Sequence, residues 1–234
     1  MGADQHHDWR GLATSALDWW RDAGVDALVD DAPRDWLARV RSPAPAVPEP
    51  AAPEAPGLPP TLPEFLVWRT GGDAPEARWG GIAVASEGDP TSALMIVVDM
   101  PGEAGLVDGA PGRLFDAMLA AIGRSRDDVY LAALACVRPM GGRIPPEDFA
   151  RLAELLGHHV ALAAPRRLLT LGQAASRAIH GTDGAVPPNS LRTVNLNGVT
   201  VETVASLHPR FLLERPELKA KAWRDLQLLV GGLP

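Results

Sequence analysis

Four short, mainly apolar runs divide the second half of this 234-residue chain, and a stretch with helical spacing follows each of them. The runs are residues 94–98, 129–134, 167–171 and 199–205. The helical stretches are residues 112–122, 146–162, 173–180 and 217–230. Strands that are mainly apolar are typical of sheets covered on both faces, and a helix between consecutive strands makes them parallel. The sequence therefore predicts an α/β fold, a three-layer α/β/α sandwich with a four-stranded parallel sheet.

Polar residues follow each predicted strand. Asp99 and Glu103 follow the first, Arg138 the second, Gln173 the third and His208 the fourth. In open sheets of this kind, ligands bind beyond the carboxyl ends of the strands. We therefore expect any chemistry to use these five residues.

The first part of the chain has a different composition. Residues 42–63 contain nine prolines among alanine and glutamate, which excludes a helix or a central strand. The sequence predicts a helical, Trp-rich appendage at 1–41, a Pro/Ala-rich linker at 42–63 and one domain at 64–234. The Pro-rich linker thus joins the N-terminal helical appendage to the α/β domain.

The appendage contains four tryptophans, Trp9, Trp19, Trp20 and Trp36. Helical spacing with a glycine stop predicts one helix ending at Gly24, and residues 32–40 predict a second. Two interpretations stay open for the tryptophans. They dock on the main domain, or they form a binding site for a protein partner, since Trp is enriched at interface hot spots.

The charge of the chain is unevenly distributed. The net charge is −7, with −8 in residues 1–93 and +1 in residues 94–234. The C-terminal part is therefore not repelled by a polyanion, and this charge permits DNA binding without predicting it.

Composition excludes several classes of protein. The single cysteine, Cys136, excludes a disulfide framework and a Cys-only zinc site, and we expect no metal and no cofactor. No apolar run reaches the roughly 18 residues that a membrane helix needs. The sequence therefore predicts a soluble, cytoplasmic protein with no membrane partner.

Six short motifs occur in order between residues 94 and 228. They are Val98-Asp-Met-Pro-Gly102, the helix 112–123, the strand and loop 128–143, Leu171-Gly-Gln-Ala-Ala-Ser176, Ser206-Leu-His-Pro-Arg-Phe-Leu-Leu213 and Pro216-Glu-Leu-Lys219. In this order they resemble the uracil-DNA glycosylase superfamily, most closely its iron–sulfur type, family 4.

The resemblance implies an activity on DNA. Enzymes of this family flip a uracil out of DNA and cleave its N-glycosidic bond, leaving an abasic site. His208 is then implied to stabilise the departing base anion by a hydrogen bond. Asp99 or Glu103 is implied to orient water or to offset the positive charge that develops on the sugar.

The same resemblance implies the DNA contacts. Leu212 and Leu213 are implied to enter the base stack where the base leaves. The other implied DNA-binding residues are Pro101, Gly102, Arg138, Arg143, Gln173, Pro209 and Arg210.

Several departures from the family fall on its cofactor site. Family 4 carries four cysteines for a [4Fe–4S] cluster, whereas this chain has one. Val137 and Leu152 stand at two ligand positions, and Cys136 is offset by one residue from its own. We therefore expect no cluster.

Other departures fall on the base pocket. The chain is shorter than the family pattern between Gly102 and Gly112, and the phenylalanine that stacks on uracil is missing from it. Ala133 replaces the asparagine that reads the uracil edge, and Asp99 replaces a glutamate. Phe115 or Trp79 are candidates to compensate.

Two hypotheses follow. The first is a glycosylase-like DNA repair or replication-associated protein with a degenerate pocket, kept for binding DNA or a protein partner, with base excision weak or lost. The alternative is an active monofunctional DNA glycosylase that removes uracil or another altered base. An unrelated small-molecule α/β enzyme has little support, because no Gly-rich phosphate loop follows any strand.

Overall fold

The structure is a computed structural model that describes residues 9–22, 57–181 and 190–231. The chain divides into two compact units, Met1–Ala55 and Pro56–Pro234. Most of the predicted linker, residues 42–56, lies outside the described residues, as does the predicted helix at 32–40.

The first unit contains the helix α1 (Trp9–Asp22), close to where the sequence predicts one. Leu17 and Trp19 are exposed on it. Trp36 lies outside the described residues. The role of the tryptophans in binding a protein partner stays a prediction.

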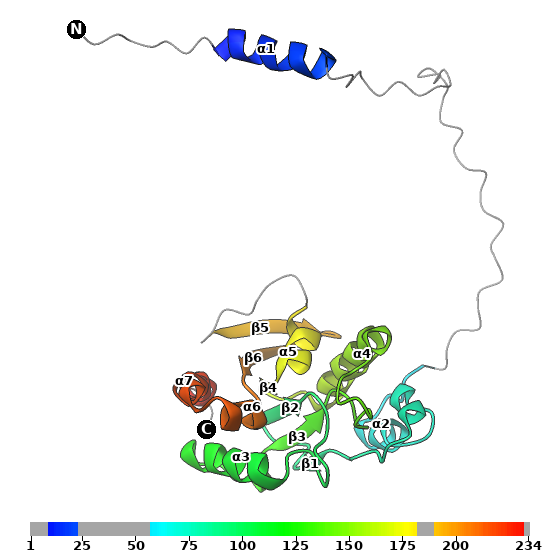
Figure 1. Cartoon of the computed structure of the whole chain (residues 1–234). Helices are drawn as coiled ribbons and strands as arrows, with labels where there is room; N and C mark the ends of the chain where they lie inside the picture. Colours follow the sequence, from blue (N-terminus) through cyan, green and yellow to red (C-terminus); the bar gives the residue numbers. More distant parts are fainter. Residues whose placement is uncertain (1–8, 23–56, 182–189, 232–234) are drawn as a thin grey trace, which may run out of the picture. The chain divides into compact units, whose positions relative to one another are not determined.

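The second unit is built on a mixed sheet of six strands in the order β1-β3-β2-β4-β6-β5 (Figure 1). The four predicted strands form its centre and run parallel: β2 (Leu94–Val98), β3 (Tyr130–Ala133), β4 (Arg167–Leu171) and β6 (Val199–Ser206). The strands β1 (Glu87–Gly88) and β5 (Leu191–Leu196) flank them and pair antiparallel. The α/β class is confirmed and the four predicted strands are parallel, but the sheet has six strands and is mixed, because the expectation missed the two antiparallel strands at its borders.

The two additional strands escape prediction for physical reasons. β1 is only two residues long. β5 carries polar, exposed residues such as Arg192 and Thr193, because it borders solvent. Its sequence signal is the Asn197-Gly198 pair, whose positive φ angles of 48° and 90° join β5 to β6 in a tight hairpin.

The helices of this unit are α2 (Leu62–Arg69), α3 (Gly109–Ala121), α4 (Pro146–Ala163), α5 (Gln173–His180), α6 (Pro209–Glu214) and α7 (Lys219–Val230). Single 3₁₀ turns lie at η1 (Pro75–Trp79), η2 (Arg126–Asp128) and η3 (Pro216–Leu218). Proline stands in the first turn of α2, α4 and α6, where its missing N–H leaves no hydrogen bond unmade. Among the described helices, none is both long enough and apolar enough to cross a membrane.

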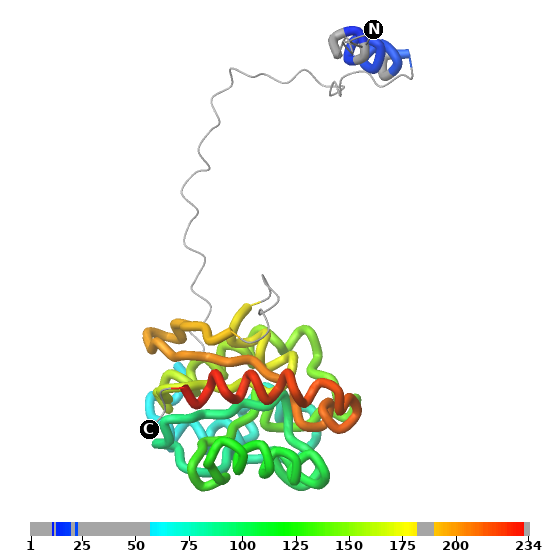
Figure 2. Tube along the Cα trace, turned by 90° about the vertical axis from the view of Figure 1, so that its left-hand side faces the viewer, coloured from blue at the N-terminus to red at the C-terminus, as the bar shows by residue number. Residues whose placement is uncertain are grey.

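Alternate residues of β2 enter two hydrophobic cores, one on each face of the sheet. Leu94, Ile96 and Val98 pack with side chains of α3 and α7. Met95 and Val97 pack with side chains of α4 and α5. Figure 2 shows α7 lying across one face of the sheet. Helices therefore cover both faces, which gives three layers.

A buried ion pair fastens residues 57–84 to the end of β3. Arg69 and Glu76 are 3% and 0% exposed and contact each other directly. Arg69 also donates a hydrogen bond to the Leu134 carbonyl at 2.7 Å, and the Cys136 N–H donates to Glu76 at 2.9 Å. Two charges and two main-chain groups thus hold this segment on the sheet.

Candidate functional site

The carboxyl ends of the four parallel strands stand side by side. Ala133 lies beside Val98, Val98 beside Leu171, and Leu171 beside Ser206. The loops that begin at these residues therefore leave the sheet from one edge. These loops carry the residues that the sequence predicts for the site.

Asp99 directly follows β2, and its carboxylate lies at the first turn of α5. It accepts a hydrogen bond from the N–H of Ala175 at 2.7 Å. Burial raises the pKa of Asp99, while the N–H groups of Ala175, Ala174 and Gln173 oppose that rise. The carboxylate thus caps a helix whose first N–H groups would otherwise have no partner.

Gly172 makes this contact possible. Its φ of +121° is one that side chains rarely adopt, and a Cβ atom there would lie 2.5 Å from the Asp99 carboxylate. Asp99 and Gly172 therefore form one unit, in which the glycine leaves the room that the carboxylate occupies.

Replacing Asp99 by alanine is expected to lower the free energy of unfolding by about 1–2 kcal/mol, because the first turn of α5 loses its capping acceptor. Urea denaturation followed by circular dichroism measures the change. Asp73→Ala, at an exposed position, is the matched control. An equal, small effect of both substitutions would show that the capping contact contributes nothing.

Glu103 lies in a turn outside this contact. It is exposed, in a turn closed by a hydrogen bond from the Gly102 N–H to the Gly105 carbonyl at 2.7 Å. The Asp108 carboxylate contacts the Ala104 N–H and fills the space where a Cβ of Gly102 would stand. Gly102 is therefore required by loop packing, and Glu103 faces solvent.

His208 occupies the N-cap position of α6. Its Nδ1 accepts a hydrogen bond from the Arg210 N–H at 3.1 Å. Burial, with a smaller contribution from the positive charge of Arg210, lowers the pKa of His208 to about 4. The ring is neutral at physiological pH, and because Nδ1 is the acceptor, the proton is on Nε2. His208 therefore presents one N–H donor without a positive charge.

Acidification is expected to destabilise the fold through buried, neutral histidines. The second of these is His159, whose Nε2 lies 2.7 Å from the Tyr130 hydroxyl and whose pKa burial lowers to about 3. Both histidines have an ordinary pKa of 6.5 when unfolded, so the unfolded chain binds protons first as the pH falls. His159 alone is expected to remove about 3 kcal/mol from the free energy of unfolding between pH 6.5 and pH 4.

Urea denaturation at a series of pH values measures this dependence. His159→Gln, which does not titrate, is expected to flatten it. An unchanged slope in that variant would contradict the assignment of the pH dependence to His159.

The polar residues predicted to bind DNA are exposed at this edge to different degrees. Arg143, Gln173 and Arg210 are exposed, whereas Arg138 is half-buried. Arg138 donates a hydrogen bond to the Pro101 carbonyl at 3.1 Å, which ties the loop after β3 to the loop after β2.

The leucines predicted to enter DNA differ from each other. Leu212 is 1% exposed, on a helix that contacts α3, so it has no free surface to insert between bases. Its role as a DNA contact stays a prediction, and in this structure the helical turn of α6 packs it into the protein. Leu213 and Phe211 are 40% and 41% exposed. Phe211 is a candidate contact that the sequence reasoning missed, although its place next to Leu212 on a helix could have revealed it.

Two prolines predicted to bind DNA, Pro101 and Pro209, are buried and offer little surface for DNA.

The two aromatic candidates for the base pocket differ in exposure: Phe115 is buried and Trp79 is half-buried. Phe115 is 1% exposed and belongs to the core between the sheet and α3. Trp79 packs against the opposite core and donates from Nε1 to Asp148 at 3.0 Å. Ala133 is buried and has no polar group for a base edge. Compensation by Phe115 or Trp79 stays a prediction, and in this structure both side chains are engaged in packing.

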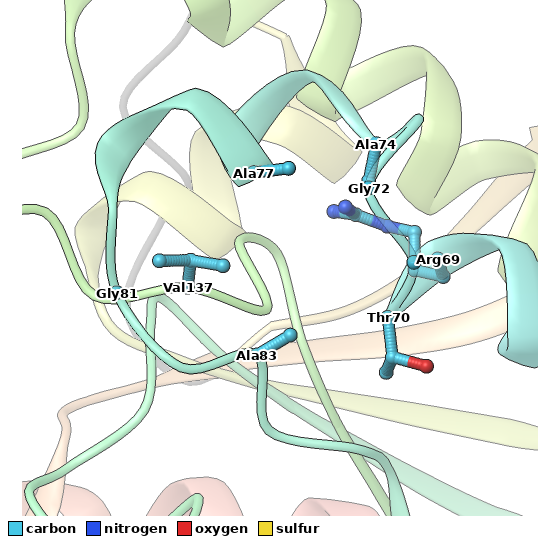
Figure 3. Close-up of a pocket in the computed structure, with 9 residues that line it drawn as sticks. Arg69, Thr70, Gly72, Ala74, Ala77, Gly81, Ala83 and Val137 are labelled. Carbon is cyan, nitrogen blue, oxygen red and sulfur yellow. The ribbon is translucent and has the colours of Figure 1, made fainter.

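The family's cluster positions do not fit an iron–sulfur group. Iron–sulfur clusters are held mainly by cysteine thiolates. Leu152 is fully buried in the core, and Val137 lines a pocket of about 210 Å³ together with Arg69 and Ala83 (Figure 3). Cys136 is buried. Within residues 9–22, 57–181 and 190–231, no three His, Cys, Asp or Glu side chains gather as metal ligands do.

Comparison with known proteins agrees with the geometry. The family model described as the uracil DNA glycosylase superfamily matches residues 85–227. The Type-4 uracil-DNA glycosylase of Pyrobaculum aerophilum is 30% identical over 163 residues, which cover 64% of this chain and 83% of that protein. The enzyme of the same name from Archaeoglobus fulgidus is 27% identical over 156 residues, which cover 62% of this chain and 78% of that protein. Because the match includes the whole sheet and more than half of the residues, this chain belongs to the uracil DNA glycosylase superfamily.

Proposed function

We propose that this protein binds DNA through the carboxyl edge of its sheet and excises uracil only weakly. Arg138 and Arg143 lie on the loop after β3 and Arg210 in the first turn of α6, and at this edge they neutralise phosphates. Gln173 begins α5, and its exposed side chain supplies a further polar contact. The relatives act on uracil in DNA, as their names state.

The observation that carries the proposal of weak excision is that the Asp99 carboxylate already accepts hydrogen bonds from the main chain of α5. Its carboxylate accepts main-chain N–H groups of α5, with the shortest contact at 2.7 Å to Ala175. A carboxylate has about four lone-pair positions, so these contacts leave little capacity to orient water. The absence of a polar group at Ala133 and the burial of Phe115 support the same conclusion.

His208 favours the second candidate, an active glycosylase. A neutral ring with the proton on Nε2 is the form that donates a hydrogen bond to a departing base anion. The N-cap contact with Arg210 holds His208 in that form. If His208 acts in this way, Glu103, being exposed, is the carboxylate left to act on the sugar.

One experiment separates the two candidates. Single-stranded and duplex oligonucleotides with one uracil are incubated with excess protein, and binding is followed by gel shift and excision by alkali cleavage. Binding with slow excision supports the proposal, and rapid excision supports the alternative. No binding to either oligonucleotide would contradict both.

A further inference from the structure

The loop after β3 presents an apolar side chain at its tip. Met140 is 100% exposed, the largest exposed fraction among the large apolar residues that the structure describes. Single exposed apolar residues are common on protein surfaces and need no explanation by themselves. The hydrogen bonds that hold this loop, and the charges beside Met140, do call for an explanation.

The loop is held in a defined shape. The Gly142 N–H donates to the Pro139 carbonyl at 2.8 Å, which closes a tight turn around Met140. Gly142 has a φ of +63°, and a Cβ there would lie 3.7 Å from the Arg138 guanidinium. Arg138 in turn donates to the Pro101 carbonyl at 3.1 Å. Met140 therefore stands on a braced turn rather than on a loose loop.

The loop also begins at the edge of the sheet that carries the predicted site. After β3 the chain continues beside the end of β2, with hydrogen bonds from the Leu134 N–H to Val98 and from the Ala135 N–H to Asp99. Five further residues lead to Met140. The tip therefore projects from the same edge as the predicted site.

Arginines flank the tip. Arg138 and Arg143 lie two residues before and three residues after Met140. Cations beside an apolar tip match the chemistry of DNA, in which phosphates border stacked bases. Proteins that kink DNA use this combination, inserting a methionine, leucine or phenylalanine between base steps while basic side chains contact the backbone.

The position of β3 separates this tip from the other apolar candidates. Phe211 and Leu213 follow β6, which lies three strand spacings from β3 in the sheet. At about 4.8 Å per spacing, the two strand ends are roughly 14 Å apart. The loop that carries Met140 and the helix that carries Phe211 and Leu213 therefore start from separate parts of this edge.

We propose that Met140 inserts into the base stack of bound DNA as a second apolar contact, on the far side of the Asp99 loop from α6. The inference rests on the proposed DNA binding. Its ligand is duplex DNA with a weakened stack, such as the duplex around an abasic site, where insertion displaces the fewest base contacts.

The test uses a duplex with one tetrahydrofuran abasic-site analogue beside a 2-aminopurine, whose fluorescence rises when it is unstacked. The full chain is expected to raise the fluorescence on binding. Met140→Ala is expected to bind this duplex about tenfold more weakly and to lose most of the rise, because burial of the methionine is lost. Met140→Leu keeps an apolar tip and is expected to retain both.

Ile82→Ala is the matched control, because Ile82 is 88% exposed and lies outside this loop. If the wild type binds the duplex but Met140→Ala gives the same affinity and the same fluorescence, insertion is overturned while DNA binding stands. If the wild type does not bind the duplex, both this inference and the proposed function fail. A loss in Ile82→Ala equal to that in Met140→Ala also overturns the assignment to Met140.

Discussion

Replacing Arg69 by methionine is expected to lower the free energy of unfolding by about 3–5 kcal/mol, the largest stability effect expected in this chain. The substitution leaves Glu76 charged at 0% exposure, facing the Cys136 N–H but without its cation. One carboxylate oxygen of Glu76, Oε2, already has no hydrogen-bond partner. The Leu134 carbonyl also loses a donor. Chemical denaturation of the wild type and the variant measures the loss.

Two further variants make this expectation specific. Arg151→Ala removes an exposed ion pair with Glu154 and is expected to cost less than about 0.5 kcal/mol. Arg69→Met combined with Glu76→Leu replaces the buried pair by apolar side chains and is expected to recover much of the loss, since no unpaired charge stays buried. A double variant as unstable as Arg69→Met alone would contradict the account in which the loss comes from an unpaired charge.

The second large effect is expected on the rate at which the protein excises uracil from DNA. The protein is expected to remove uracil between about 30- and 25,000-fold more slowly than the Pyrobaculum aerophilum relative. The estimate adds a missing base stack and a missing base-edge contact, each worth about 1–3 kcal/mol. Single-turnover alkali cleavage with both proteins at one temperature measures the ratio. Rates within about threefold of each other would contradict the degenerate pocket.

His208 is expected to account for the excision that persists. His208→Asn keeps a side-chain oxygen that can cap α6 but removes the Nε2 donor. We expect roughly a 100-fold further loss of rate with little change in stability, as for the removal of one donor to a developing anion. If His208→Asn unfolds more easily and excises equally well, His208 acts only as a cap.

The sequence predicts the centre of the fold better than its borders. β2 is apolar at every position and β4 has three leucines among its five residues, a composition typical of strands buried on both faces. β5 is polar because it lies at the edge, and nothing but the Asn197-Gly198 turn marks it. Periodicity reports burial, so strands at the surface of a sheet leave a weak signal.

The sequence likewise predicts some features of the candidate site and misses others. The motif order places Asp99 and His208 at one edge, and the structure agrees. It does not reveal that Asp99 caps α5, because that contact joins residues 76 positions apart in the chain. Nor does it separate buried Leu212 from exposed Leu213, which depends on how α6 lies against α3. Contacts between distant segments decide both outcomes.

The two borders of the sheet also bear on self-association. Unpaired edge strands are templates on which a second chain can add, and this leads to aggregation. At one border, β1 is two residues long, and Gly88 within it has a φ of +84°. At the other, β5 carries an exposed arginine, Arg192. A short, bent edge and a charged edge both discourage strand addition, so the long apolar strands at the centre are kept from templating fibrils.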